Sequence, residues 1–503
     1  MTDKAAKILG WLAPLVAGGL ITLSFAPFFW WPLGILGALL MAWTWRQQTP
    51  RQAFLSGWLL GVGLFGSGAS WIYVSIHVHG YAPVPLALFL TLLFVMGLAL
   101  FPALQGWLLA RFLRRDGVWY LLSFPSLWML AEWFRGWFLT GFPWLYLGTA
   151  HVETPLAGWA PVAGVFGVSF VVAFSAVALL AAFQNRNRPA YAGLLIAVLL
   201  WGAGAGLRTY SWSTPLNAPL RVALVQGNIA QELKWREDEQ LNTIRTYRRL
   251  SQPYWDHDLV LWPETAIPLF MHQAQPLLDV LSREARTQGA TLISGIPTAY
   301  PRQEVPGYRI HNSILALGNG SGIYHKQKLV PFGEYVPLES VLRGLIQFFD
   351  LPMSSFTPGA RHQAPLMLGQ TTTSPFICYE VVYPDFVAAM GSNSDLLLTI
   401  SNDSWFGASI GPHQHLQIAQ MRALENARYM VRATNNGISA IIDEKGRVLD
   451  RSQQFVAEVL TGTAQPMQGR TPFSQTGSMP TLVLAIALAL LARRPRQAQP
   501  SST

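Results

Sequence analysis

Long apolar runs, separated by short polar segments, dominate the first 208 residues of the chain. A helix that crosses a membrane needs about 20 predominantly apolar residues. The runs of this kind are Ile8–Ala26, Phe28–Trp45, Ala53–Val74, Val84–Ala110, Val118–Phe134, Ala160–Phe183, Pro189–Leu207 and Phe473–Ala492. The first run is followed too soon by others to be a cleaved signal peptide. The pattern predicts an eight-helix transmembrane bundle, with seven spans early in the chain and one, the weakest signal, near its end.

Residues 209–479 have a different pattern, in which short apolar runs alternate with helical periodicity. The runs typical of strands are Arg221–Gln226, Asp258–Trp262, Thr291–Gly295, Ser313–Leu317, Pro375–Tyr379, Leu396–Ile400 and Gly437–Ile442. The helical patterns are Glu237–Leu250, Gln275–Gln288 and Gln414–Asn426. Strands that alternate with helices indicate an α/β layered domain. We therefore predict three parts: a seven-span region over 1–208, an α/β domain over 209–479, and a last span with a short tail over 480–503.

The amino-acid composition supports the membrane assignment. The chain is 51% hydrophobic and only 12% charged, whereas an ordinary soluble domain carries roughly 25% charged residues. The net charge of +9 raises the question of a nucleic-acid partner. However, residues 1–208 and 480–503 hold 14 Lys and Arg against 4 Asp and Glu, while residues 209–479 hold 21 against 22. Because the basic excess belongs to the apolar parts of the chain, it reports membrane topology and not nucleic-acid binding.

The positions of Lys and Arg in the short loops predict the orientation of the spans, because cytoplasmic loops carry the positive excess. If the spans alternate in direction, one side receives twelve of these residues: Lys4, Lys7, Arg46, Arg51, Arg111, Arg114, Arg115, Arg186, Arg188, Arg493, Arg494 and Arg496. The short segments on the other side hold only Arg135 and Arg208. We therefore predict that both termini are cytoplasmic and that residues 209–479 lie outside the cytoplasm.

Cys378 is the single cysteine of the chain, which excludes an intrachain disulfide. It stands near the end of an apolar strand pattern. A strand-to-helix turn at this point would expose the sulfur beside backbone N–H groups, as in a nucleophile elbow. A small buried side chain that fills space is the alternative. A lone thiol outside the reducing cytoplasm is a liability unless it is used, but the residue alone leaves both interpretations open.

Three other segments also place polar side chains after apolar runs. Glu264 lies between two prolines, where partial desolvation suits a general base; a solvated loop glutamate is the alternative. Lys326 and Lys328 precede a Pro-Phe-Gly turn and Glu334, where a lysine can stabilise an oxyanion, although a basic surface strand is the simpler interpretation. The polar and aromatic segment Ile400–Gly407 is compatible with a binding wall or with a plain turn.

Taken together, the four segments resemble the nitrilase superfamily, whose catalytic residues are Glu, Lys and Cys in that order along the chain. The order here is Glu264, Lys326 and Cys378. Two long segments carry the resemblance further: Leu-Val-Pro-Phe-Gly-Glu-Tyr-Val-Pro and Thr-Ile-Ser-Asn-Asp-Ser-Trp-Phe-Gly. With seven spans before the domain and one after it, the whole chain resembles the membrane-bound acyltransferases of this superfamily. The resemblance implies a nitrilase-like α-β-β-α domain.

The resemblance also implies roles for individual residues. Cys378 is expected to be the nucleophile, Glu264 the general base, and Lys326 the catalytic lysine. Lys326 is chosen over Lys328 because it lies eight residues before Glu334 of the Pro-Phe-Gly-Glu segment. Supporting roles are expected for Glu334, Tyr379 and Glu380, and substrate-binding roles for Trp235, Asn312 and Trp405.

The reaction implied by the resemblance is an acyl transfer in two steps, through a thioester on the cysteine. The donor would be a membrane phospholipid, and the acceptor the N-terminal amine of the diacylglyceryl-cysteine of an apolipoprotein. The catalytic domain would be periplasmic, on a monomer in the bacterial inner membrane, with no cofactor, metal ion or nucleic acid. His413 and His415 form an H-x-H pair without a third ligand at convincing spacing, so we interpret them as structural.

The apolar stretch Leu338–Phe356 predicts either a membrane-dipping arm that admits acyl chains or a core helix. Two rival functions are considered. A membrane-anchored amidase of the nitrilase type would use the same three residues with water as acceptor, but an anchor needs one span and not eight. A transporter with an extracytoplasmic sensor domain would place ionisable groups at the membrane midplane, which the nearly uncharged spans disfavour.

Overall fold

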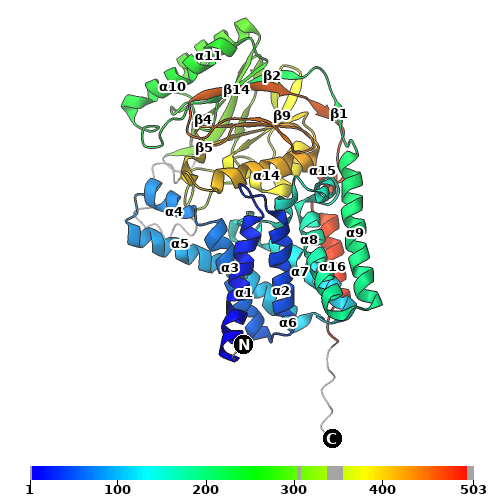
Figure 1. The fold of residues 1–503 in the computed structure, drawn as a ribbon. Helices are drawn as coiled ribbons and strands as arrows, with labels where there is room; N and C mark the ends of the chain where they lie inside the picture. The colour runs from blue at the N-terminus through cyan, green and yellow to red at the C-terminus, as the bar shows by residue number, and fades with distance from the viewer. Residues whose placement is uncertain (1–2, 303–306, 337–354, 496–503) are drawn as a thin grey trace. The chain divides into compact units, whose positions relative to one another are not determined.

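The structure is a computed structural model that describes residues 3–302, 307–336 and 355–495. It divides into two compact units, shown in Figure 1. The first unit contains residues 3–70, 89–209 and 478–495, and the second contains residues 71–88 and the described residues between 210 and 477. The stretch Leu338–Phe356, predicted to be an arm or a core helix, lies outside the described residues except for its last two positions.

The first unit is built from helices. They are α1 (Asp3–Leu23), α2 (Trp31–Trp45), α3 (Pro50–Gly68), α5 (Val84–Leu98), α6 (Leu100–Phe112), α7 (Gly117–Arg135), α8 (Ala160–Asn185), α9 (Arg188–Thr209) and α16 (Met479–Leu491), of which α5 begins in the second unit. Small residues bring some of these helices close together. A Cβ atom on Gly57 of α3 would lie 2.2 Å from the carbonyl oxygen of Pro102 in α6. Close approach through glycine is typical of helix packing in membranes.

The length and composition of the helices indicate membrane crossings. Among the described residues, three helices are long and apolar enough to cross a membrane: Val84–Phe112, Pro155–Asn185 and Arg188–Thr209. A fourth is counted if the bent pair Pro50–Gly68 and Ile72–His79 forms one span. Shorter apolar helices cover Trp11–Leu23, Trp31–Trp45 and Met479–Leu491. The apolar helical region is therefore confirmed, whereas the count of eight spans stays a prediction.

Some of the predicted spans are interrupted near glycine residues, as two examples show. In the predicted span Ala53–Val74, α3 ends at Gly68, and α4 (Ile72–Val74) and the π-helix η1 (Ser75–His79) follow. In the predicted span Phe473–Ala492, Gly477 has a φ of +59°, so α15 (Pro472–Thr476) ends before α16 begins. Glycine adopts such a backbone without strain and commonly ends helices. Hydropathy does not register the first break, because apolar side chains continue on both sides of Gly68, whereas polar residues surround Gly477: Ser474, Gln475, Thr476 and Ser478.

The second unit contains two large sheets. The first has the strand order β14-β2-β3-β4-β5-β7, formed by β14 (Glu458–Ala464), β2 (Leu220–Gln226), β3 (Leu259–Leu261), β4 (Thr291–Pro301), β5 (Tyr308–Gly318) and β7 (Ile323–His325). The second has the order β13-β12-β11-β10-β9-β8-β6, formed by β13 (Val448–Arg451), β12 (Ala440–Ile442), β11 (Met430–Thr434), β10 (Leu396–Ser401), β9 (Thr371–Ile377), β8 (Leu366–Leu368) and β6 (Gly320–Ser321). A small two-stranded sheet pairs β1 (Thr214–Pro215) with β15 (Met467–Gln468).

Two hydrophobic clusters define the layers of the second unit. One cluster lies between the sheets and draws on both of them, with Leu224, Leu261, Ile377 and Leu398 among its members. On the other face of the first sheet, Trp262 clusters with Tyr247 and Leu281 of two covering helices. The longer helices among the described residues of this unit are α10 (Glu237–Ser251), α11 (Gln275–Gln288), α13 (Pro384–Gly391) and α14 (Gly411–Asn426). Because α13 and α14 pack against the second sheet, the described residues form helix, sheet, sheet and helix layers.

Three neighbouring strands run parallel in each large sheet, β2-β3-β4 in the first and β9-β10-β11 in the second. Parallel strands deliver the residues that follow them to one edge of the sheet. The predicted catalytic segments follow β3 and β9, and the polar segment after β10 joins them. The topology therefore gathers these turns, which are far apart in the sequence.

Candidate active site

Glu264 lies in the turn after β3 and is buried, with both carboxylate oxygens held. Its Oε1 accepts a hydrogen bond of 2.8 Å from the side-chain amide of Asn312, on β5. Its Oε2 accepts one of 2.9 Å from the backbone N–H of Asn402, which directly follows β10. The two sheets thus hold the carboxylate between them. A carboxylate fixed in this way, with lone pairs left over, has the chemistry of a general base.

Lys326 follows β7, and its side chain is only 1% exposed. Its Nζ lies 2.8 Å from the carboxylate of Glu334 and 3.8 Å from Oε1 of Glu264. Burial alone would lower the pKa of Lys326, but the two carboxylates outweigh burial and raise this pKa above its ordinary value. The lysine is therefore a fixed positive charge beside Glu264.

Glu334 completes this group. Its Oε2 accepts a hydrogen bond of 2.9 Å from the backbone N–H of Val330, and its Oε1 accepts one of 3.0 Å from Asn312. The amide of Asn312 therefore donates to two carboxylates at once, those of Glu264 and Glu334. In the structure Asn312 orders these groups, and its predicted role in substrate binding stays a prediction.

Cys378 is half-buried and begins the 3-10 helix η7 (Cys378–Val382) directly after β9. Its φ of +54° is in the left-handed region that non-glycine residues rarely adopt, as expected for an elbow that presents a nucleophile. Burial and the nearby carboxylates of Glu264 and Asp403 raise the pKa of the thiol to about 12, against the opposing effect of Lys326. The resting thiol is therefore protonated and needs a base.

Glu380 is fully buried and joins the cysteine turn to the lysine segment. Its Oε2 accepts a hydrogen bond of 2.8 Å from the backbone N–H of Ile377. Its Oε1 accepts bonds from the N–H groups of Gln327 and Lys328 and from the Tyr324 hydroxyl. Burial raises the pKa of Glu380 to about 7, although Lys326 and the backbone donors oppose this rise. The predicted supporting carboxylate thus cross-links the two chain segments that carry Cys378 and Lys326.

Alkylation of Cys378 measures the thiol directly, because the chain has no other cysteine. The alkylation rate of the folded enzyme with iodoacetamide is expected to rise about tenfold per pH unit from about pH 7 to pH 10, since the thiolate fraction grows in this way below the pKa. The unfolded chain is the control, and its rate should level off above an ordinary thiol pKa of about 8.5. A rate that levels off at the same pH in the folded enzyme would contradict the raised pKa.

The three aromatic residues of the prediction lie on turns of the second unit. Trp235 ends the turn at 231–235, next to Lys234, whose buried Nζ donates a hydrogen bond of 2.7 Å to the backbone oxygen of Glu264. Trp405 lies in the 3-10 helix η8 (Asp403–Phe406), just after Asn402. The Tyr379 ring, next to Cys378, lies 5.6 Å from the ring of Tyr383. Their roles stay predictions, and the sequence did not single out Lys234, which carries no motif of its own.

The segment 71–88 contributes to the second unit in a way that the sequence did not predict. The Ser75 hydroxyl donates a hydrogen bond of 2.7 Å to the backbone oxygen of Trp405, and Nε2 of His79 lies 2.8 Å from that of Ser404. The ring of His79 lies 5.3 Å from the ring of Trp405. In the sequence, the only indication of this contact is a group of polar residues at the end of an apolar run: Ser75, His77 and His79. This segment supports η8 and with it the turn that holds Glu264.

His415 contacts two groups of the second unit, and the interpretation of His413 and His415 as structural stays a prediction. Its Nδ1 lies 3.1 Å from Oδ1 of Asp403, and its Nε2 lies 3.2 Å from the backbone oxygen of Cys378. In the described part of the chain, no group of three or more His, Cys, Asp and Glu side chains is arranged to hold a metal ion.

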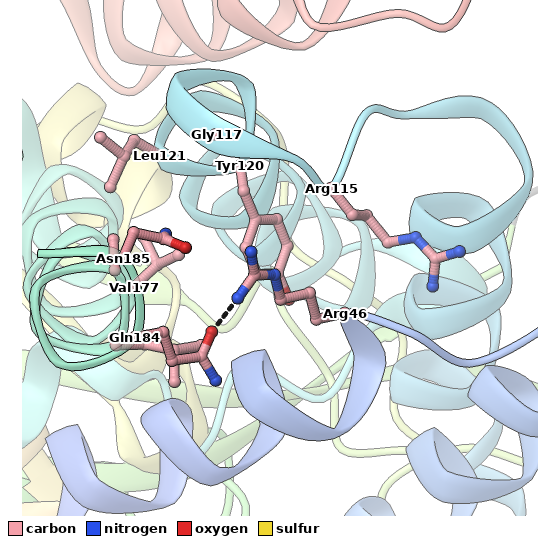
Figure 2. A pocket seen from close by; sticks show the side chains of 10 residues that line it. Arg46, Arg115, Gly117, Tyr120, Leu121, Val177, Gln184 and Asn185 are labelled. Carbon is pink, nitrogen blue, oxygen red and sulfur yellow. Dashed lines mark hydrogen bonds between the residues drawn. The ribbon is translucent and has the colours of Figure 1, made fainter. Parts of the chain in front are cut away.

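A small cavity in the first unit is shown in Figure 2, lined by Arg46, Arg115, Tyr120 and Gln184 among others. Arg46 donates a hydrogen bond to the side chain of Gln184. Arg115 donates one of 2.6 Å to the backbone oxygen of Gln48, and the Tyr120 hydroxyl donates one of 2.6 Å to that of Ala42. These bonds join the ends of α2, α7 and α8, so Arg46, Arg115, Tyr120 and Gln184 each have a structural partner.

The chain is similar to known proteins. Residues 221–471 match the family model of carbon-nitrogen hydrolases. Nit3 of Saccharomyces cerevisiae, a member of branch 10 of the nitrilase superfamily, aligns with 51% of this chain and 93% of its own, with 17% identity and a TM-score of 0.38. The family model over residues 221–471 assigns the second unit to the carbon-nitrogen hydrolase class.

Matches that include the rest of the chain identify a family within this class. Residues 17–178 match the family model of the apolipoprotein N-acyltransferase N-terminal domain. The chain is 47% identical over 495 residues to the apolipoprotein N-acyltransferase of Pseudomonas syringae pv. tomato, covering 96% of this chain and 98% of the relative. It is 49% identical over 504 residues to that of Azotobacter vinelandii, covering 98% and 97%. The chain belongs to the apolipoprotein N-acyltransferase family.

Proposed function

We propose that this enzyme transfers an acyl chain from a membrane phospholipid to the N-terminal amine of the diacylglyceryl-cysteine of apolipoproteins. One observation carries the proposal. Glu264, Lys326 and Cys378 lie within electrostatic reach of one another at the ends of the strands, in a chain that is similar over nearly its full length to apolipoprotein N-acyltransferases. The apolar helices of the first unit support a lipid donor.

The first half of the reaction makes the acyl-enzyme. Glu264 accepts the thiol proton of Cys378, and the sulfur attacks the ester carbonyl carbon of the phospholipid. The new oxyanion is stabilised by the ammonium of Lys326 and by the backbone N–H that follows Cys378. When the oxyanion collapses, the C–O bond of the ester breaks, and the proton held by Glu264 passes to the departing lysophospholipid alkoxide. The carbonyl carbon is then joined to sulfur as a thioester.

The second half of the reaction transfers the acyl chain to the acceptor. The free α-amine attacks the thioester carbon, and Glu264 accepts a proton from the nitrogen. The C–S bond breaks because a thiolate leaves more readily than an alkoxide, and the sulfur recovers the proton. The products are an amide and the original thiol, so the cycle closes without a cofactor, a metal ion or an external base.

The membrane arrangement belongs to the proposal. We infer eight spans, with seven in residues 1–208 and one in residues 480–503, both termini in the cytoplasm, and a periplasmic catalytic domain over residues 209–479 of a monomer in the bacterial inner membrane. The asymmetry of Lys and Arg in the short loops supports this orientation. A nucleophile outside the cytoplasm would act at the outer leaflet, where both lipid substrates expose their head groups.

Mass spectrometry of the purified full-length enzyme tests the proposed function. The enzyme is incubated with a phospholipid that carries deuterated acyl chains, and its intact mass is recorded before and after a diacylated lipopeptide with a free N-terminus is added. We expect a deuterated acyl adduct on Cys378 that disappears as the lipopeptide gains the same mass.

Two controls separate this function from the alternative. Cys378→Ala should form no adduct, and a lipopeptide with an acetylated N-terminus should leave the adduct in place. Release of free fatty acid at the same rate with either peptide would favour the nitrilase-type hydrolase. Full turnover with Cys378 unmodified would overturn the mechanism.

A further inference from the structure

A buried polar network that this mechanism does not use contacts the cysteine turn. Asp403 is its centre: Arg432 donates a hydrogen bond of 2.7 Å to Oδ2, and Nδ1 of His415 lies 3.1 Å from Oδ1. All three side chains are fully buried. Burial alone would raise the pKa of Asp403, but Arg432 and His415 lower it below its ordinary value, so the carboxylate is ionised. A buried ion pair is weak evidence for a gain in stability. The position of this network beside the cysteine turn suggests an effect on Cys378 instead.

The network reaches Cys378 in two ways. The His415 ring contacts the backbone oxygen of Cys378, at the residue with the left-handed backbone. Ser401, the last residue of β10, donates a hydrogen bond of 2.6 Å to Oδ1 of Asp403. It lies beside Cys378 across the parallel strands β10 and β9, because the residues just before them, Ile400 and Ile377, are paired, and its hydroxyl interacts with the Cys378 sulfur. A hydroxyl has one proton, so while Ser401 donates to Asp403 it can only accept from the thiol. Ser401 therefore stands between the reacting sulfur and a fixed carboxylate.

We propose that Ser401 is a catalytic residue that exchanges its hydrogen-bond partner during the reaction; this inference rests on the proposed role of Cys378. In the resting enzyme the Ser401 hydroxyl donates to Asp403 and accepts from the thiol. When the thiol proton passes to Glu264, the hydroxyl turns and donates to the thiolate. No covalent bond changes at Ser401, and its proton stays on Oγ. Asp403 keeps the hydrogen bond from Arg432, so its charge is not left unpaired.

The charges around the sulfur explain why the exchange of hydrogen-bond partners would help the reaction. The groups concerned are Glu264, Lys234, Lys326, Asp403 and His415. The carboxylates of Glu264 and Asp403 oppose ionisation of the thiol, and Lys326 favours it. A hydroxyl that turns to the sulfur stabilises the thiolate without adding another charge. The same bond stabilises the sulfur when it leaves in the second half of the reaction, so both halves benefit.

Ser401→Ala tests the proposal. The variant is expected to form the acyl-enzyme about tenfold to a hundredfold more slowly, the usual cost of losing one hydrogen bond to a charged group. Its alkylation by iodoacetamide should require a pH about one unit higher than the wild type for the same rate. Ser401→Thr keeps the hydroxyl and should recover most of the acylation rate.

Thr399→Val is the matched control. Thr399 lies two residues earlier on β10 and is fully buried, and its hydroxyl has no hydrogen-bond partner within the described residues. This variant should acylate and alkylate like the wild type. Thermal unfolding of every variant is recorded, because a purely structural role of Ser401 would lower the unfolding temperature without moving the pH dependence.

The outcomes separate the two proposals. Equal acylation rates and equal alkylation profiles for Ser401→Ala and the wild type would overturn the role of Ser401 and leave the proposed function standing. A slower Ser401→Ala with an unmoved alkylation profile would also overturn it, since the residue would then act only on the fold. If the wild type itself gave no acyl adduct on Cys378, the proposed function would fail first.

Discussion

Replacing Lys326 with methionine is expected to slow formation of the acyl-enzyme by about a hundredfold to a thousandfold, the usual effect of removing one group that stabilises an oxyanion. Methionine preserves the apolar length of the side chain but carries no charge. The ammonium of Lys326 is the cation that faces both Glu264 and Glu334. The oxyanion would therefore develop beside two carboxylates without the ammonium that faces both of them. The rate is measured by quenching the reaction and recording the mass of the adduct on Cys378.

The same substitution is also expected to lower the free energy of unfolding by about 3–5 kcal/mol, because it leaves buried carboxylates without their cation. Lys328→Met is the matched control, since it makes the same change two residues further along the chain. Lys328 is exposed, and its Nζ lies 5.5 Å from the ring of Tyr383. This control should keep both its acylation rate and its unfolding temperature. If it lost as much activity as Lys326→Met, the choice of catalytic lysine would be wrong.

The second unit was predictable from the sequence to a large extent, because its strands are strongly apolar and its polar groups follow them. Each of the seven runs predicted to be strands overlaps an observed strand, and the three helical patterns correspond to α10, α11 and α14. Glu264 and Cys378 follow β3 and β9 as expected. A parallel strand delivers the next side chain to the edge of its sheet, so the position of the turn could be inferred before its neighbours were known.

Contacts between residues that are far apart in the sequence could not be predicted from hydrophobic periodicity. Arg432 meets Asp403 across 29 residues of sequence, and Ser75 meets Trp405 across 330. Periodicity shows that a side chain is buried, but not which side chain it meets. The break of the predicted span Ala53–Val74 near Gly68 was also not predicted. Apolar side chains continue past the residue where the helix ends, so the hydropathy pattern does not show the break. The positioning groups of the site are of this long-range kind, and they required the structure.

Glu264→Gln is the second substitution with a large expected effect, a loss of about a hundredfold to ten-thousandfold in acylation, the range of general-base catalysis. Glutamine preserves the size of the side chain. However, Asn312 and the backbone N–H of Asn402 each donate to one carboxylate oxygen. The new amide can accept at its oxygen only, so its NH2 group would face one of these donors. The variant thus loses the base and also a contact, and the size of the effect alone does not separate the two causes.

The pH dependence of the residual reaction separates them. Burial and the nearby carboxylates raise the pKa of the Cys378 thiol to about 12, so very little thiolate exists at neutral pH unless a base removes the proton. Glu264→Gln removes one of the carboxylates that raise this pKa, but burial and Asp403 still raise it. The acylation that remains in the variant must therefore start from a small thiolate fraction, and its rate should rise about tenfold per pH unit between about pH 7 and pH 8.5. The wild-type rate should stay level over the same range, because Glu264 takes the proton directly. A slow rate that is independent of pH in the variant would mean that Glu264 only positions its neighbours, and the base would then have to be sought elsewhere in the site.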